Sequence, residues 1–347
     1  MKQTDIASMS ITELSVLLAS MGEQEYRAKQ IYAWIHRRGA QSIGEMTDLS
    51  ASLRSRLDAS VIYASPRQLL VQQSQLDGTR KYLFELTDGN RIESVLMRYQ
   101  HGNSVCISSQ AGCRMGCSFC ASAIGGLNRN LTAGEMLGQI YQIQRDTGER
   151  VSHVVVMGTG EPLDNYANLL RFIRMLSDAD GLHISQRNLT LSTCGLVPRI
   201  YDLAKEHFAL TLAISLHASS QESRERLMPV AKRYDLDSLL KACAFYFAET
   251  GRRISFEYSL IADVNDTPAE AQRLGSLLHG RNCHVNLIPV NPVFESGYRT
   301  PGRERTERFK KTLEKYGINV TIRREMGRDI DGACGQLRLH AEARHES

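Results

Sequence analysis

The sequence contains no run of 18 apolar residues and no signal-peptide pattern. The first absence excludes a membrane-spanning helix, and the two together lead us to expect a cytoplasmic protein. Thiols remain reduced in that compartment, so the 8 cysteines are not expected to form structural disulfides. We therefore interpret the cysteines as metal ligands or as reagents.

The sequence also lacks a strong excess of one charge. The net charge is only +4, from 42 Lys and Arg against 38 Asp and Glu, so the total gives no argument for nucleic-acid binding. The distribution is more informative, because residues 299–315 together with residues 323–328 contain ten basic residues and four Glu. Such a density suits an RNA backbone. The alternative is a solvated helix face, since Glu304, Glu307 and Glu314 alternate with the basic residues.

No internal repeat or low-complexity segment is present, and 42% hydrophobic residues in a chain of 347 suffice for a large core. We expect a boundary near residue 90. Before it, apolar residues recur at helical spacing, as in Leu14, Leu17 and Leu18, and predict a small helical domain. The second expected helix is basic, which suits RNA binding or an ordinary solvated face. Its basic residues are Arg27, Lys29, His36, Arg37 and Arg38.

After a probable hairpin over residues 82–97, apolar strand-like runs alternate with helical stretches. This alternation predicts an α/β fold with a parallel sheet, either open or closed as a barrel. We expect three parts: a helical domain and hairpin lead-in over 1–90, the main domain over 91–325, and a terminal loop and tail over 326–347. The expected strands are 105–107, 153–157, 188–192, 211–216, 254–261, 285–289 and 319–323.

Three cysteines, Cys113, Cys117 and Cys120, lie close together in a Cys-x3-Cys-x2-Cys loop that has no fourth cysteine. Four thiolates would complete a structural zinc or iron–sulfur site, whereas three leave one metal position open for chemistry. The flanking glycines allow the backbone to wrap around a bulky cluster. The alternative is a zinc site with Cys106 as the fourth ligand, but zinc ligands usually occur as two separated pairs.

The loop, with Phe119 before its last cysteine, resembles that of the radical S-adenosylmethionine (SAM) enzymes. Three further motifs resemble one branch of these enzymes, the adenine-C2 RNA methyltransferases. They are Gly158-Thr159-Gly160-Glu161-Pro162, Ser215-Leu216-His217 and Asp331-Gly332-Ala333-Cys334-Gly335-Gln336-Leu337.

The resemblance implies a radical SAM partial (β/α)6 barrel with a small N-terminal helical accessory domain that helps to bind RNA. It also implies one [4Fe-4S] cluster on Cys113, Cys117 and Cys120, and two SAM molecules per turnover. Thr159 is a minor departure from the family motif. The residues implied to contact SAM are Gly160, Glu161, Ser192, Ser215, Leu216, His217 and Asn291.

The resemblance further implies why additional cysteines are needed. Adenine C2 lies between two electron-withdrawing nitrogens and does not attack a SAM methyl group directly. Cys334 would carry the methyl group to the base, and Cys106 would help to deprotonate C2 and release the product through a disulfide with Cys334. Glu93 would accept the proton. From the residues alone, Cys106 could instead be a buried strand cysteine and Glu93 the polar face of a strand.

The partners implied are 23S ribosomal RNA near the peptidyl-transferase centre, adenosine 37 of transfer RNA, and an electron donor such as flavodoxin or ferredoxin; no membrane partner is expected. The target base must be unpaired or flipped. One alternative is the related enzyme that methylates adenine C8 and confers antibiotic resistance, which usually has Ala where this chain has Pro162. Another is a zinc-stabilised RNA-binding protein without catalysis.

Overall fold

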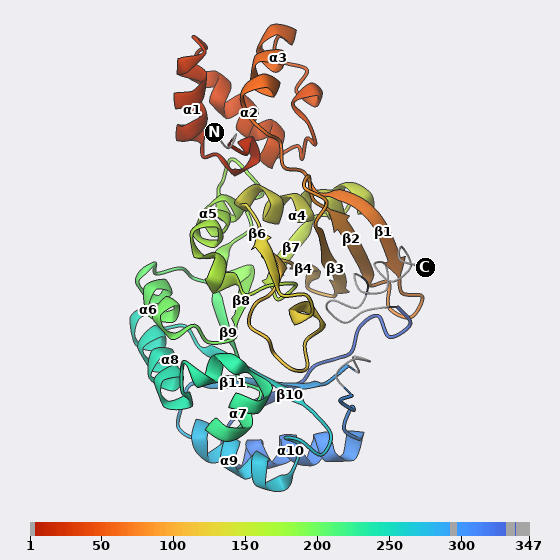
Figure 1. The fold of residues 1–347 in the computed structure, drawn as a ribbon, viewed down its shortest axis with the longest axis vertical. Coiled ribbons are helices and arrows are strands. Elements are labelled where there is room, and N and C mark those ends of the chain that lie inside the picture. The colour runs from red at the N-terminus through yellow and green to blue at the C-terminus, as the bar shows by residue number, and fades with distance from the viewer. Residues whose placement is uncertain (1–3, 292–296, 331–336, 338–347) are drawn as a thin grey trace.

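A computed structural model describes residues 4–291, 297–330 and 337 (Figure 1). The N-terminal part is helical, with α1 (Ile11–Ser20), α2 (Tyr26–His36) and α3 (Ala51–Ser60), and short 3-10 helices at Ile6–Ser8 and Ile43–Glu45. Ser10 and Glu13 form a capping box that fixes the start of α1. The helices pack around buried apolar residues such as Leu14, Leu18 and Ile31, as their spacing predicts.

A ten-stranded sheet forms the main body, in the order β1-β2-β3-β4-β7-β8-β9-β10-β11-β12. The first four strands are antiparallel: β1 (Arg67–Gln73), β2 (Arg80–Glu85), β3 (Arg91–Tyr99) and β4 (Gly102–Ile107). From β4 onward the pairing is parallel. The parallel strands that follow are β7 (Val151–Val156), β8 (Leu189–Thr193), β9 (Thr211–Ser215), β10 (Ile254–Leu260), β11 (Cys283–Pro289) and β12 (Asn319–Ile322).

One helix connects each pair of successive parallel strands and covers the outside of the sheet (Figure 1). These connecting helices are α4 (Ala133–Thr147), α5 (Tyr166–Ser177), α6 (Val197–Lys205), α8 (Leu236–Thr250), α9 (Pro268–Leu278) and α10 (Arg303–Lys315). A further short helix, α7 (Gln221–Leu227), follows β9. Strand side chains such as Val154, Leu191 and Leu212 are fully buried. The six βα units form an α/β fold with a parallel sheet, as the alternation of strands and helices in the sequence predicts.

The expectation of mostly helical structure before the hairpin is wrong for β1. The segment Arg67–Gln73 forms an edge strand, and β1 to β3 extend the main sheet rather than a separate unit. The expected hairpin is present, since β2 pairs with β3 around Asp88, Gly89 and Asn90. Within the described residues, no helix is both long and apolar enough to span a membrane.

Candidate functional site

The three-cysteine loop lies between two short antiparallel strands, β5 (Gln110–Gly112) and β6 (Leu127–Asn130). Gly112 has φ +78°, and a Cβ at this position would collide with the carbonyl group of Gly126. A residue other than glycine would therefore push the two strands apart. The strand pair closes the base of the loop and fixes both of its ends.

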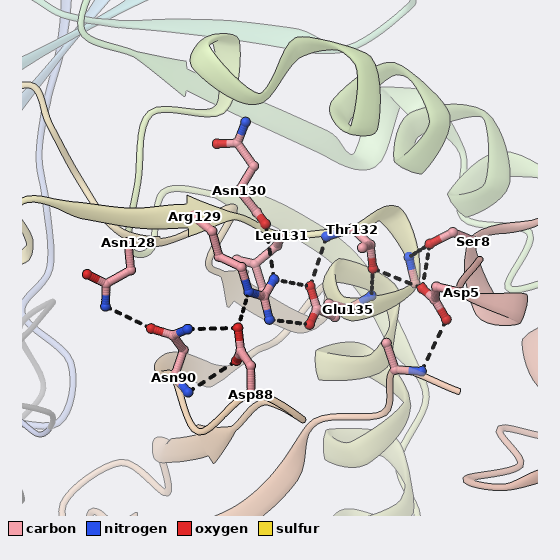
Figure 2. A network of polar contacts seen from close by, with 12 residues as sticks. Asp5, Ser8, Asp88, Asn90, Asn128, Arg129, Asn130, Leu131, Thr132 and Glu135 are labelled. Carbon is pink, nitrogen blue, oxygen red and sulfur yellow. Dashed lines mark hydrogen bonds and ion pairs between the residues drawn. The ribbon is translucent and has the colours of Figure 1, made fainter. Parts of the chain in front are cut away.

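A polar network holds β6 in place (Figure 2). The Arg129 guanidinium donates to both carboxylate oxygens of Glu135, at 2.8 and 2.7 Å, and also pairs with Asp88 in the β2–β3 turn. Thr132, the N-cap of α4, donates to Asp5 at 2.9 Å. The network therefore joins the N-terminal segment, the hairpin turn, α4 and the strand that leaves the cysteine loop.

A cavity of about 260 Å³ opens at the carboxyl ends of the parallel strands, where ligands bind in this class of fold. It brings together most of the residues singled out from the sequence. The predicted residues that line it are Cys113, Cys117, Cys120, Gly160, Glu161, Ser192, Ser215, His217 and Asn291. The hydroxyl oxygens of Ser192 and Ser215, on β8 and β9, are 3.4 Å apart. Leu216 is fully buried in the core and is not among the lining residues, so only its backbone could face a ligand.

Glu161 is buried and holds the loop after β7 against the end of β8. Its carboxylate accepts the backbone N–H groups of Cys194, at 2.7 Å, and Leu163, at 3.0 Å. Burial raises the pKa of this carboxyl group, while these hydrogen bonds oppose the shift. Gly160 has φ +111°, and a Cβ there would lie 2.6 Å from the Gln110 side chain. The loop thus requires glycine, and Glu161 orders the loop as well as facing the cavity.

The ring of His217 is a neutral hydrogen-bond donor, and its orientation is fixed by the backbone of Ser259. Its Nδ1 accepts the backbone N–H of Ser259 at 2.9 Å, so the proton resides on Nε2. Burial lowers the pKa of His217 to about 3. The ring also packs edge-on against Phe119 of the cysteine loop, with centroids 4.9 Å apart. His217 therefore links the end of β9 to the loop.

Cys106 faces a second, larger cavity of about 520 Å³. This cavity shares Asn291 and Arg323 with the first one, so the two are adjacent. Its wall carries four arginines, Arg303, Arg323, Arg324 and Arg328, against two glutamates, Glu307 and Glu325, and is therefore basic on balance. Cys106 pairs with Val95 of β3, and these two residues lie on the same face of the sheet.

Glu93 lies on the same face of β3 as Val95, two residues away. It is buried, and its Oε2 lies 3.1 Å from the Nζ of Lys81, which is completely buried. Lys81 itself pairs with Val95 across β2 and β3. The structure therefore places Glu93, Lys81 and Cys106 along one face of three neighbouring strands.

Cys334 lies outside the described residues. The last described part of the chain before it, which ends at residue 330, is anchored, because the Asp329 carboxylate accepts hydrogen bonds from the Ser74 hydroxyl at 2.6 Å and the Gln75 N–H at 2.7 Å. Met326 and Arg328 line the same cavity as Cys106. The chain that leads to Cys334 thus passes along the wall of the second cavity.

Comparison with known proteins agrees with this geometry. Residues 4–62 match the ribosomal RNA large subunit methyltransferase N-terminal domain, and residues 107–273 match the radical SAM superfamily. Curated proteins named probable dual-specificity RNA methyltransferase RlmN are 57% identical in Lachnoclostridium phytofermentans, covering 97% of this chain and 95% of that one, and 57% in Lachnospira eligens, covering 96% of each. The chain belongs to the RlmN family.

A crystal structure of a radical SAM methyltransferase from Sphaerobacter thermophilus shows the same fold as this RlmN family member. The TM-score is 0.92 at 43% identity, over 96% of this chain and 98% of that one. Enzymes of this family use a [4Fe-4S] cluster and SAM, with two SAM molecules per turnover.

The three loop cysteines fit such a cluster better than a single ion. Burial, followed by the neighbouring charge of Cys120, raises the pKa of Cys113 to about 11, and burial also raises that of Cys117. Three thiolates here therefore need a cationic group. Cys106 lines the second cavity, whereas the three loop cysteines line the first, which disfavours one zinc ion bound by all four. The three loop cysteines would hold a [4Fe-4S] cluster and leave one metal position open for a ligand.

Sequence reasoning missed one residue of this RlmN site and misplaced another. Lys81 carries no motif, and its ion pair with Glu93 appears only when β2 and β3 are paired. Arg323, expected as part of the basic cluster, lies on the wall of both cavities. Cys194 carries no motif either; it is buried, and it also lines the first cavity, where its N–H donates to Glu161. His36 was grouped with the exposed basic residues of α2, but it is buried and its Nδ1 lies 2.8 Å from the Tyr141 hydroxyl oxygen. His36 differs from its exposed neighbours because it contacts Tyr141 on α4, and the sequence pattern does not reveal that contact.

Proposed function

We propose that this protein methylates C2 of an adenosine in 23S ribosomal RNA and of adenosine 37 in transfer RNA. The observation that carries the proposal is the adjacency of two cavities. One contains the three loop cysteines, and the other contains Cys106 and a basic rim. Asn291 and Arg323 lie on the wall of both. A radical made in the first cavity would therefore have a short path to a base held in the second.

In the first cavity, Cys113, Cys117 and Cys120 would hold the cluster, and SAM would lie against the carboxyl ends of β7 to β11. When bound there, the cluster and SAM supply a 5′-deoxyadenosyl radical. The hydroxyl groups of Ser192 and Ser215 can orient the polar groups of SAM, and the Nε2–H of His217 can donate to an acceptor. The buried Glu161 keeps the loop after β7 in position to receive the amino group.

In the second cavity, Cys334 would carry a methyl group obtained from one SAM by displacement. Loss of a hydrogen atom from this methyl group to the 5′-deoxyadenosyl radical would give a carbon radical that adds to adenine C2, and the adduct would then return one electron to the oxidised cluster. Glu93, held by Lys81, would take the C2 proton. The Cys106 thiolate would then attack the Cys334 sulfur and break the bond between that sulfur and the carbon on the base. This carbon would take up a proton to become the methyl group, and a disulfide would be left for later reduction.

The arginines of the second cavity, Arg303, Arg323, Arg324 and Arg328, can bind the phosphates that flank a flipped adenosine. We further propose that the N-terminal helices contribute to RNA binding and that a flavodoxin or ferredoxin supplies electrons. Part of the basic surface is already paired: Arg305 of α10 contacts Asp263 and Asp266 at 2.7 and 3.0 Å, and Arg328 contacts Glu325 of the same cavity wall at 2.6 Å. Arg303, Arg323 and Arg324 are therefore the arginines of the cavity that we propose as the main phosphate-binding residues.

The test is product analysis. Reconstituted, reduced protein is incubated with SAM and either 23S ribosomal RNA or transfer RNA, and the RNA is then digested and analysed by mass spectrometry. We expect 2-methyladenosine, with 5′-deoxyadenosine formed in parallel. Finding 8-methyladenosine would assign the C8 reaction instead. A colourless protein that binds one zinc, rather than about four irons, would favour RNA binding without catalysis.

A further inference from the structure

Arg224, in α7, is a completely buried cation that has no carboxylate partner among the described residues. One of its nitrogens, Nη2, donates to the carbonyl oxygen of Cys194 at 2.6 Å. Its Nε and Nη1 are buried and have no hydrogen-bond partner within the described chain. An unpaired buried charge costs several kcal/mol, so a group outside the polypeptide is the natural source of compensation.

The helix that carries Arg224 is joined to the three-cysteine loop. The carbonyl oxygen of Leu227, at the end of α7, accepts the backbone N–H of Ser118 at 3.0 Å, and Ser118 follows Cys117 directly. Arg224 lies one turn earlier on the same helix. Its hydrogen-bond partner, Cys194, lines the same cavity as the three loop cysteines. The guanidinium therefore lies directly behind the wall of the site that we assign to the cluster.

The side chains that oppose the effect of burial on Arg224 are all cysteines. Burial lowers the pKa of Arg224, and the neighbouring Cys194, Cys117 and Cys243 oppose that shift. Of these three, Cys117 is a proposed ligand. A [4Fe-4S] cluster held by three thiolates is net negative, and it becomes more negative when it accepts an electron. A fixed cation behind it, in a region that excludes water, stabilises the reduced form more than the oxidised form.

We propose that Arg224 is the built-in counter-charge of the cluster and that it raises the cluster's reduction potential, so that a one-electron carrier can reduce it. Arg224 acts through the cluster and is a positioning residue, not a catalytic one. The inference rests on the cluster of the proposed function and is independent of the RNA substrate.

The experiment is a redox titration of the reconstituted protein, followed by electron paramagnetic resonance without RNA. For Arg224→Met we expect the equilibrium constant for reduction to fall at least tenfold, which corresponds to about 59 mV. Arg224→Lys, which keeps the charge, should stay close to the wild type, whereas the neutral Arg224→Gln should follow Met. The matched control is Arg226→Met, because Arg226 lies on the same helix but is exposed and screened by water. An unchanged potential in Arg224→Met with full iron content would overturn the proposal.

A second measurement covers the case in which Arg224→Met takes up no cluster. Without the cluster, the buried guanidinium lacks compensation, so Arg224→Met should leave the metal-free protein at least as stable as the wild type in a urea titration. A purely structural role predicts the opposite, since the hydrogen bond to Cys194 would be lost. A large destabilisation of the metal-free variant would therefore refute the proposal. If the Arg224 variants give the expected results but the protein does not methylate RNA, only the proposed substrate is contradicted.

Discussion

The Nζ of Lys81 lies 3.1 Å from the Oε2 of Glu93, and both side chains are buried between neighbouring strands. The pair lies on the face of the sheet that carries Cys106. Burying one charge without the other is expensive, because neither water nor a second ion would replace the lost partner. Lys81 therefore fixes the position of the Glu93 carboxylate, which we propose as the proton acceptor.

Replacing Lys81 with Met should reveal this dependence. We expect the free energy of unfolding to fall by about 3–5 kcal/mol, the usual cost of removing one partner of a buried ion pair. The measurement is a urea titration of the metal-free protein. Adding Glu93→Gln to Lys81→Met should restore part of the loss, since the uncompensated charge is removed. The matched control is Arg67→Met, which breaks a cross-strand pair with Glu85 whose arginine is largely exposed, and which should have little effect. Equal losses in the two variants would contradict the assignment.

Glu93→Gln should uncouple radical formation from methyl transfer. The amide cannot accept the C2 proton, and loss of a general base typically costs 10²–10⁴-fold in rate, so we expect about a hundredfold less 2-methyladenosine. Iron content and 5′-deoxyadenosine formation should remain near the wild-type levels, because Glu93 is not among the residues that line the first cavity. A variant that produces methylated RNA at the normal rate would remove Glu93 from the mechanism.

The parts of this molecule that could be predicted from sequence are those fixed by local pattern. The βα alternation predicted every parallel strand, because runs rich in apolar residues, such as 154–157, recur between helical stretches as they do in a parallel sheet. Strand β1 was missed, since its sequence, Arg67–Gln73, is mostly exposed at a sheet edge and lacks alternation. An edge strand acquires its structure from its neighbour, and that information is not local.

The residues of the candidate site likewise fall into two groups: those that a local sequence pattern predicts and those that only the tertiary fold brings together. The cysteine loop and the loop after β7 contain glycines with positive φ angles, which other residues rarely adopt. Both loops could therefore be recognised in the sequence. Lys81 and Arg224 could not, because each depends on a partner that only the tertiary fold brings near. A lysine in a strand is normally a solvent-facing residue, and its burial becomes reasonable only beside Glu93.

Cys106→Ala should trap the enzyme on its RNA. Without the Cys106 thiol, the proposed bond between Cys334 and the base has no route to release, so we expect a covalent complex that survives a denaturing gel. The control is Cys283→Ala, which removes a buried cysteine at the start of β11 and should release product normally. Free product at the normal rate from Cys106→Ala would refute this role.

Cys334→Ala should abolish methyl transfer while leaving the cluster intact. The residue is the proposed methyl carrier, and the three loop cysteines do not depend on it. Incubation with radiolabelled SAM, followed by protein digestion, should show label on a cysteine peptide in the wild type and none in the variant. Iron content should be equal in both. Label retained in the variant would place the carrier elsewhere.

His36 predicts a pH dependence of stability that arises at the contact between α2 and α4. Burial lowers the pKa of His36 to about 3, below the value of about 6.5 for an unfolded chain. Between these values the unfolded chain binds a proton that the folded protein does not, so stability is lost as the pH falls from about 6.5 toward 3, at up to about 1.4 kcal/mol per pH unit. Urea titrations of metal-free protein between pH 7.5 and 4.5 should show a shallower loss for His36→Gln than for the wild type. Arg37→Gln, at the neighbouring exposed position, should retain the wild-type slope. If His36→Gln and the wild type lost stability in parallel, a different group would be responsible for the acid sensitivity.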